Sequence, residues 1–357
     1  MRIAQIAPLA ERCPPLLYGG TERVVSYLTE ALVALGHDVT LFASGDSMTS
    51  AELVPCCTRA LRLNEQVRDS IPHISMMLDQ VSRRANEFDV LHFHIDLMHA
   101  PLVRPYIHRT ITTLHGRLDL PDLAPFYEHF SDLPVVSISE SQRGPLPHAN
   151  WIGTVHHGLS RGLLPFSPKH DGYLAFIGRI SPEKRPDRAI EIAARCGLPL
   201  KIAAKVDRAD EVYWRDLIEP MVRAHPNVEF IGEIDEAQKA ALLGNARALL
   251  FPIDWEEPFG LVMIEAMACG TPVIAFRRGS VPEVIDDGVS GFIVEDVQSA
   301  VRAVEKLDLL DRRRVRSTFD QRFTVERMAH DYLEIYRARA AAHRVARPSL
   351  TAVSLRA

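Results

Sequence analysis

Short apolar runs alternate with longer amphipathic stretches along nearly the whole chain. The apolar runs have the length of buried strands, and they recur at residues 2–7, 38–43, 89–95, 110–114, 134–139, 154–158, 173–177, 200–204, 228–231, 248–251, 272–276 and 292–294. The other stretches predict helices at residues 21–35, 74–87, 187–196, 209–224, 235–245, 261–270 and 298–309. Strands that alternate with helices are typical of a mostly parallel sheet covered by helices, so the pattern predicts an α/β fold.

The alternation is interrupted at residues 163–170, which are rich in proline, and it restarts after them. A chain of 357 residues suits two domains of about 150–180 residues each better than one. We therefore predict a first domain over residues 1–166, a second over 167–325 and a flexible basic tail over 346–357, with a cleft between the domains.

Ligands of such sheets bind beyond the carboxyl ends of the strands. His115, Ser139 and His157 stand at three predicted strand ends, so they could line one crevice. The first strand-to-helix turn contains Gly19 and Gly20, and Thr21 is expected to cap the helix that follows. The glycines either let the backbone approach a ligand or form a plain tight turn. A dinucleotide site is disfavoured because the turn lacks G-x-G-x-x-G.

The stretch Glu257–Ala275 is the most informative for function. A Pro-Phe-Gly turn precedes an apolar helix that is expected to end at Gly270, and its free N–H groups would favour an anion. Glu265 lies inside this helix, where its carboxylate can accept hydrogen bonds from vicinal sugar hydroxyls, and Glu257 lies in the turn. Arg179 and Lys184 stand in another strand-to-helix loop, where their charges would suit a diphosphate.

A histidine-rich strand raises the hypothesis of a zinc site. His92, His94 and Asp96 share one strand face, and the run resembles the H-x-H-x-D-H signature of metallo-β-lactamase-like hydrolases. Leu97 stands where the last histidine ligand belongs, so histidines satisfied by the core or lining a crevice are the favoured interpretation. The chain also lacks an Asp-x-Asp clamp for a divalent ion.

Composition indicates the partners and cellular location of the protein, and it says less about the reaction. The net charge of -5 gives no indication of a nucleic-acid partner. The five cysteines form no C-x-x-C pair, and no signal peptide or membrane span is evident, so a reducing, cytoplasmic location is expected. From Arg337 onward the chain has five arginines and no acid. This stretch could contact the inner face of a membrane, although a solvated tail is the favoured interpretation.

The stretch at 257–275 reads E-P-F-G-L-V-x-x-E-A-M-A-C-G-x-P-V-I-A, and it resembles the retaining glycosyltransferases of family 4. These enzymes have the GT-B fold, in which two Rossmann-like domains enclose a cleft. The resemblance extends over nearly the full length and is supported by Tyr18–Glu22, Thr113–His115, Val155–Gly158, Gly178–Lys184 and Gly279–Ile285. His157 departs from the family pattern, which more often has asparagine there.

The resemblance implies a role for each predicted site residue. Arg179 and Lys184 would hold the donor diphosphate, and Glu265 would bind the ribose. Glu257 would contact the transferred sugar, together with backbone N–H groups of Phe259, Gly260 and Leu261. In the same family, His115 would touch the donor sugar, Ile234 the base, and Gly19 and Gly20 the phosphates or the acceptor. A last helix, at about 326–345, would cross back onto the first domain.

The expected activity is transfer of a sugar, with retention, from a nucleotide-sugar donor to an acceptor hydroxyl. The family favours a UDP-sugar, whereas the acceptor could be a glycan, a lipid-linked sugar or a small molecule. No metal or other cofactor is expected, because cations and a helix dipole would stabilise the leaving diphosphate. The alternatives are a sugar-nucleotide 2-epimerase, a non-catalytic sugar-nucleotide-binding subunit and, last, a zinc hydrolase.

Overall fold

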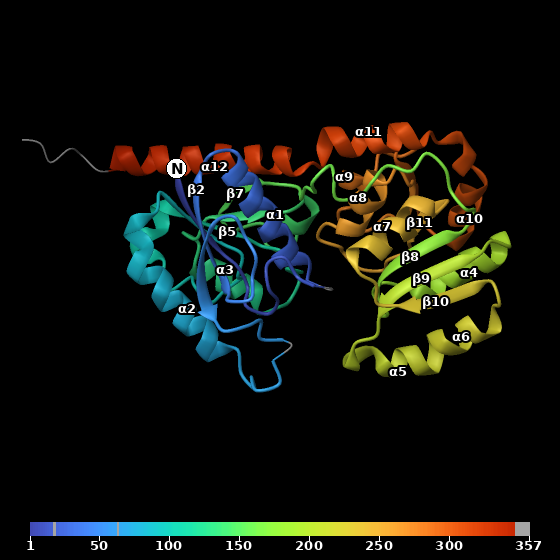
Figure 1. The fold of residues 1–357 in the computed structure, drawn as a ribbon, viewed down its shortest axis with the longest axis horizontal. Helices are drawn as coiled ribbons and strands as arrows, with labels where there is room; N and C mark the ends of the chain where they lie inside the picture. The colour runs from blue at the N-terminus through green and yellow to red at the C-terminus, as the bar shows by residue number, and fades with distance from the viewer. Residues whose placement is uncertain (17–18, 63, 347–357) are drawn as a thin grey trace, which may run out of the picture.

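The computed structural model describes residues 1–16, 19–62 and 64–346, and its strands form two separate parallel sheets (Figure 1). The first sheet has the order β3-β2-β1-β4-β5-β6-β7, and the second has the order β10-β9-β8-β11-β12-β13. Every pair of neighbouring strands is parallel. The predicted α/β fold with two Rossmann-like halves is therefore confirmed.

The first half of the chain supplies the seven-stranded sheet. Its strands are β1 Arg2–Ile6, β2 Asp38–Ser44, β3 Glu52–Cys57, β4 Val90–Phe93, β5 Thr110–Thr113, β6 Val135–Ser137 and β7 Trp151–Thr154. Its helices are α1 Gly20–Ala34, α2 Ile71–Arg84 and α3 Leu123–His129, with short turns at η1 Ala85–Glu87, η2 Arg104–Arg109 and η3 Ser141–Arg143.

The second half supplies the six-stranded sheet. Its strands are β8 Leu174–Arg179, β9 Leu200–Lys205, β10 Val228–Gly232, β11 Ala248–Phe251, β12 Val273–Phe276 and β13 Gly291–Val294. Its α-helices are α4 Pro186–Cys196, α5 Glu211–Tyr213, α6 Glu219–Ala224, α7 Glu236–Asn245, α8 Leu261–Ala268, α9 Val281–Val284, α10 Val297–Glu305 and α11 Arg312–Arg322.

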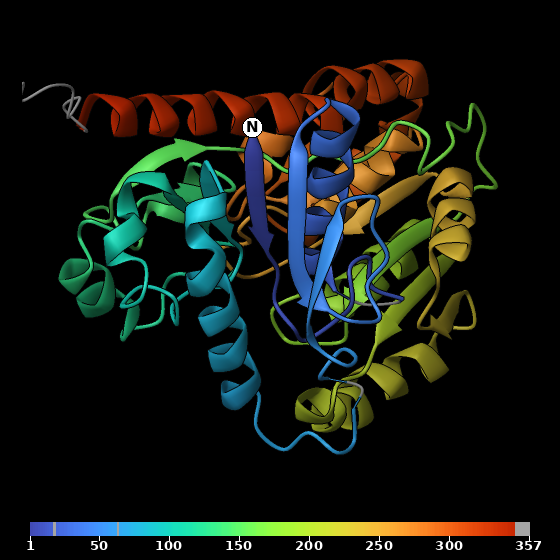
Figure 2. The same cartoon turned by 60° about the vertical axis from the view of Figure 1, so that its left-hand side comes forward.

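The helix α12, Val325–Ala346, lies against the first half although it follows the second in sequence (Figures 1 and 2). It packs on α1, β4 and η2. Tyr332 and Tyr336 are fully buried there, in a cluster with Ile3, Leu28 and Val90. Burying side chains of this size stabilises the fold by about 1.5–3 kcal/mol each, so α12 is part of the core of the first half.

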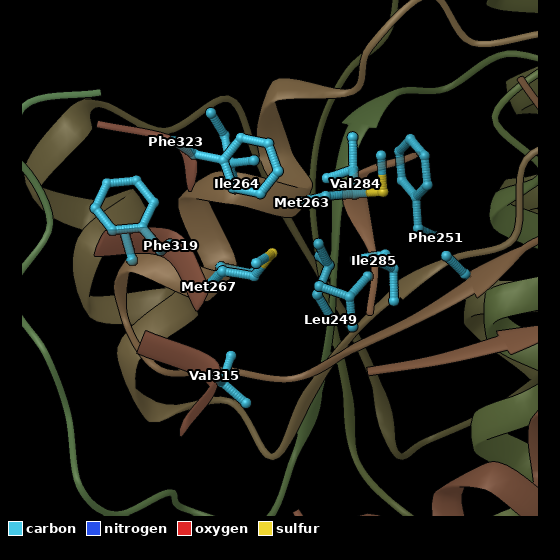
Figure 3. Packing of buried hydrophobic residues seen from close by; sticks show 14 of the residues in the cluster. Leu249, Phe251, Met263, Ile264, Met267, Val284, Ile285, Val315, Phe319 and Phe323 are labelled. Atoms are coloured by element: carbon cyan, nitrogen blue, oxygen red, sulfur yellow. The ribbon is translucent and has the colours of Figure 1, made fainter. Parts of the chain in front are cut away.

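The helix α8 is buried on nearly all sides in the core of the second half. Met263, Ile264 and Met267 pack between Leu249 and Phe251 of β11 on one side and Val315, Phe319 and Phe323 from and beside α11 on the other (Figure 3). An apolar helix in such a place has little reason to carry a charge. The buried carboxylate of Glu265 on α8 therefore needs a partner.

The structure corrects four details of the predicted elements. The helix α1 begins at Gly20 with Gly19 as its N-cap and has no side-chain cap, so Thr21 does not cap it. The strand predicted at 154–158 is β7 and ends at Thr154, because the chain turns so that the His156 and His157 carbonyls can accept from Arg327 at 2.7 and 2.8 Å.

The helix predicted at 209–224 is divided by a π-helical segment, Trp214–Ile218. Pro220 stands two residues after this segment, and its missing N–H removes a regular α-helical bond. The helix predicted to end at Gly270 ends at Ala268. Within the part of the chain that the structure describes, no helix combines the length and apolar character needed to cross a membrane.

Candidate active site

A cavity of about 480 Å³ lies between the two sheets and is lined from both. All the residues predicted as site residues line it, namely Gly19, Gly20, His115, Arg179, Lys184, Ile234, Glu257, Phe259, Gly260, Leu261 and Glu265. His157 lines it as well. Ser139 is absent from the lining, because its buried hydroxyl is turned to the N–H of Gln142 at 3.1 Å. The shared crevice predicted for these strand ends therefore holds for the two histidines and is wrong for Ser139.

Lys184 and Glu257 form an ion pair at the centre of the second-half wall. The Lys184 Nζ contacts Glu257 Oε2 and lies 4.9 Å from the centroid of the Trp255 ring. The Trp255 Nε1 donates to the same carboxylate oxygen at 3.1 Å. These contacts fix the direction of the Glu257 carboxylate, whereas its Oε1 makes no hydrogen bond to another described residue. Trp255 is a wall residue that the sequence analysis did not single out.

The turn after Glu257 opens the N-terminus of α8 toward the cavity. Gly260 has φ +80°, and a Cβ at this position would lie 2.7 Å from the Met263 Cε. No side chain caps α8, so its first N–H groups remain available to an anion. Phe259 and Leu261 flank the turn and complete this part of the lining.

The stretch after β12 holds that turn in place from behind. Gly279 has φ +52°, and a Cβ there would lie 2.4 Å from the backbone N and O of Glu257. Ser280 donates its N–H to the Glu257 carbonyl at 3.0 Å and its hydroxyl to the Phe259 carbonyl at 2.8 Å. Glycine and a small hydroxyl residue are therefore required where the motif at 279–285 begins.

Glu283, in the same motif, joins the second half to the first. Its carboxylate accepts the N–H groups of Glu140 and Ser141, each at 2.7 Å, and lies 3.3 Å from the His156 Nε2. Burial alone would raise the pKa of Glu283, but these donors hold it below its ordinary value. The sequence analysis did not assign this residue a role.

Arg179 stands at the end of β8 among three carboxylates. Its guanidinium is 3.4 Å from Glu183, 3.8 Å from Asp207 and 3.9 Å from Asp210. These distances are longer than those of strong hydrogen bonds. The three carboxylates keep the Arg179 guanidinium at the cavity, and its N–H groups form no strong hydrogen bond with them.

Two neutral imidazoles line the first-half wall. The His115 and His157 rings stack with centroids 5.4 Å apart. Burial lowers the pKa of His115 to about 3 and holds that of His157 well below its ordinary value. Each ring has a buried Nδ1 without a hydrogen-bond partner in the described structure. A neutral imidazole with an unused nitrogen can bond a hydroxyl of a ligand.

The histidines behind this wall are engaged in the core. His94 bonds the Gln5 amide at 2.7 Å and His115 at 2.9 Å, while His92 bonds Tyr336 and Thr113, each at 2.7 Å. No group of three metal-ligating side chains that could hold an ion occurs among the described residues. The arrangement does not supply the ligand set that the zinc hypothesis requires.

Glu265 also lines the cavity, as does Ile234 of the β10–α7 loop. Its side chain is only 6% exposed, and its Oε1 contacts the Lys239 Nζ at 2.5 Å. Glu257 and Glu265 are thus each paired with a lysine of their own, while both still line the cavity.

Comparison with known families identifies both halves. Residues 18–161 match the model described as Glycosyltransferase Family 4, and residues 165–321 match the model described as Glycosyl transferases group 1. The chain is 26% identical over 338 residues to a phosphatidyl-myo-inositol mannosyltransferase of Mycobacterium leprae, which covers 87% of each chain. It is 25% identical over 388 residues to a glycogen synthase of Mycobacterium tuberculosis, which covers 90% of this chain and 92% of the relative.

Among solved structures, the Anabaena protein HepE in complex with UDP and glucose superposes with a TM-score of 0.70. The match covers 95% of this chain and 100% of HepE at 16% sequence identity, so it bears on the fold alone. The fold, the matched families and the residues gathered in the cleft agree with one another. The chain belongs to glycosyltransferase family 4 and is a glycosyltransferase with the GT-B fold.

Proposed function

We propose that this enzyme transfers a sugar from a nucleotide-diphosphate donor, with a UDP-sugar as the first candidate, to an acceptor hydroxyl with retention of configuration. One observation carries the proposal: the cavity gathers Arg179, Lys184 and the uncapped start of α8 beside two carboxylates, Glu257 and Glu265. Positive groups suit a diphosphate, and carboxylates suit hydroxyls of a sugar and a ribose.

The charge that develops in the reaction explains why the positive groups are assigned to the diphosphate and the carboxylates to the hydroxyls. When the bond between the anomeric carbon and the phosphate oxygen breaks, negative charge grows on the diphosphate, where Arg179, Lys184 and the α8 dipole stabilise it. Lys184 is paired with Glu257, so the cation proposed for the phosphates stands beside the carboxylate proposed for the sugar. Stabilisation that grows in the transition state is what accelerates the step.

The first-half wall favours attack of the acceptor from the side of the leaving group. Glu22 lines this wall, but its carboxylate is engaged by the N–H of Glu11 at 3.1 Å, and His115 and His157 are neutral. We therefore assign no enzymic nucleophile. The acceptor oxygen bonds the anomeric carbon, the bond to phosphate breaks, and the acceptor proton passes to the leaving phosphate oxygen.

The identities of donor and acceptor are proposed more broadly. The relatives named above are a mannosyltransferase and a glycogen synthase, and HepE was solved with UDP and glucose. Their names support a hexose donor and leave open a glycan, a lipid-linked sugar or a small molecule as acceptor. A membrane contact by the basic C-terminal stretch also stays a proposal: Arg337 pairs with Glu334, and residues 347–357 lie outside the described structure.

The experiment is a mass-spectrometric screen for donor hydrolysis and transfer against UDP-, GDP- and ADP-sugars. We expect one donor class to be turned over, and Arg179→Ala or Lys184→Ala to lower turnover by about a hundredfold or more. Lys201→Ala serves as the control, because Lys201 lies outside the cavity lining and 3.9 Å from Glu229.

Other results would favour the alternatives. Isomerisation of the donor without an acceptor would indicate an epimerase, and tight binding without turnover would indicate a binding subunit. Near wild-type turnover in Arg179→Ala and Lys184→Ala would contradict the diphosphate assignment.

A further inference from the structure

Four ionised side chains form a continuous chain from one half of the molecule to the other. Arg23 of α1, in the first half, contacts the Glu236 Oε1 of α7 at 2.5 Å. The same oxygen lies 2.8 Å from the Lys239 Nζ, which in turn contacts the Glu265 Oε1 of α8 at 2.5 Å. The chain ends on the carboxylate that the proposed function assigns to the ribose.

Three of the four members of this network are buried. The exposed fractions of the Arg23, Lys239 and Glu265 side chains are 9%, 11% and 6%, whereas the Glu236 side chain is 33% exposed. Burial alone would lower the pKa of Lys239, but the carboxylates of Glu265 and Glu236 outweigh it and hold the pKa above its ordinary value. Lys239 therefore stays charged, and its removal would leave the buried Glu265 carboxylate without its cation.

The network leaves one oxygen of Glu265 for a ligand. Lys239 holds Oε1, whereas Oε2 makes no hydrogen bond to any residue that the structure describes. Glu265 itself lines the cavity. A carboxylate anchored through one oxygen presents the other in a fixed direction, which lowers the entropy lost when a hydroxyl binds.

We propose that Lys239 is a positioning residue that aims Glu265 at the ribose, and that Glu236 and Arg23 hold Lys239 in place. Through Arg23, which also lines the cavity, the first half of the molecule then takes part in ribose recognition. The inference rests on the proposed function, in which Glu265 accepts hydrogen bonds from the ribose hydroxyls. It adds Lys239, Glu236 and Arg23 to the residues that determine ribonucleotide selectivity.

The test compares a ribonucleotide with its 2′,3′-dideoxy counterpart. Dissociation constants of both are measured by calorimetry, using whichever of UDP, GDP and ADP binds the wild-type enzyme most tightly. Because hydrogen bonds to a charged group contribute about 1.5–3 kcal/mol, wild type should prefer the ribonucleotide by about 10- to 100-fold. Lys239→Met and Glu265→Gln should both lose most of this preference while binding the dideoxynucleotide as wild type does.

Two further variants and one control complete the design. Glu236→Gln and Arg23→Met should lose part of the preference, about threefold to tenfold, because the ion pairs of Glu236 and Arg23 reach Glu265 by way of Lys239. Lys201→Met removes a lysine outside the network and should keep the full preference. If Lys239→Met does not fold, as judged by its thermal melt, Glu236→Gln decides the question.

The outcomes distinguish a failure of the positioning role of Lys239 from a failure of the ribose role of Glu265. If Glu265→Gln keeps the preference, the ribose role of Glu265 is wrong. If Glu265→Gln loses it and Lys239→Met keeps it, the ribose role stands and the positioning role is overturned. If Lys239→Met weakens both nucleotides equally, Lys239 acts on the phosphates or on the fold, and the inference is overturned as well.

Discussion

Gly260 shows how much a single residue decides at this site. Its positive φ sets the turn that opens α8 to an anion, and the space for a Cβ is taken by Met263. Gly260→Ala should lower the free energy of unfolding by about 2–4 kcal/mol, because backbone strain and a side-chain clash add. Urea unfolding would measure the loss.

A second glycine separates the two causes. Gly172 also has a positive φ, of +91°, but a Cβ there would meet no atom within 4 Å. Gly172→Ala should therefore cost only the backbone strain, about 1–2 kcal/mol. Equal losses in the two variants would show that Met263 moves aside without cost.

The buried histidines predict how stability changes with pH. Burial lowers the pKa of His92, His94, His99, His115 and His157 below that of the unfolded chain. Between the unfolded pKa of about 6.5 and the folded values, the unfolded state binds more protons. The stability from neutral burial is thus complete above about pH 6.5 and is lost as the pH falls toward the folded values.

A substitution of His115 measures the contribution of one buried histidine to the pH dependence of stability. In His115→Gln the slope of unfolding free energy between pH 6 and 5 should become shallower by about 1 kcal/mol per pH unit, since one fewer proton is taken up. Denaturant titrations at several pH values would measure it. An unchanged slope would mean that the His115 pKa is not depressed.

At the scale of elements, α12 is held to the first sheet by polar contacts as well as by packing. The Tyr336 hydroxyl accepts from the Gln5 amide at 3.0 Å and bonds the His92 Nδ1 at 2.7 Å. Tyr336→Phe should therefore destabilise the protein by about 1–3 kcal/mol, because the Gln5 and His92 groups stay buried and lose a partner. Thermal unfolding would measure the loss.

The control for this variant is Tyr106→Phe. Tyr106 is only half-buried in η2, so its hydroxyl can exchange its bonds for water, and the change should be within about 0.5 kcal/mol. A Tyr336→Phe melt as high as that of the control would contradict a role for the polar contacts.

The elements also show why sequence reasoning succeeded in some places and failed in others. Most of the strands and α8 were predictable because their apolar runs are bounded by glycine, proline or polar residues. The helix α11 was missed, since among its arginines only a few positions, such as Val315 and Phe319, are buried. The edge strand β3 was missed because Pro55 interrupts its pattern. Neither α11 nor β3 can be predicted from its own residues without knowing which elements it packs against.

The same limit holds for the site. The spacing of Glu257 and Glu265 and the loop of Arg179 and Lys184 were sufficient to place one wall of the cleft. Lys239 and Trp255 could not be found in this way, because each acts through a residue distant in sequence or through ring packing. Hydrophobic periodicity predicts which face of a helix or strand is buried. It does not predict which polar side chain from another element contacts that face.

At the scale of the whole molecule, two contacts between the halves should differ in how strongly they hold the halves together. Glu283 accepts two backbone N–H groups and is 22% exposed, whereas Arg117 and Glu183 form a more exposed pair at 3.1 Å. Glu283→Ala should loosen the halves, so that the radius of gyration in solution rises and the KM for the donor increases severalfold. Small-angle scattering and steady-state kinetics would measure both effects.

Arg117→Ala is the matched control across the same cleft. An exposed pair contributes about 0–1 kcal/mol, so this variant should leave both the radius of gyration and KM near the wild-type values. If the two variants behave alike, Glu283 does not fix the halves.

The return of α12 to the first half has a consequence for biosynthesis. The core of that half is completed by Tyr332 and Tyr336, which follow the entire second half in the chain. The first half must therefore wait, with part of its apolar surface uncovered, while the second half is translated. A gene fragment that ends after β7 would encode the first sheet without α12, whose buried tyrosines complete its core.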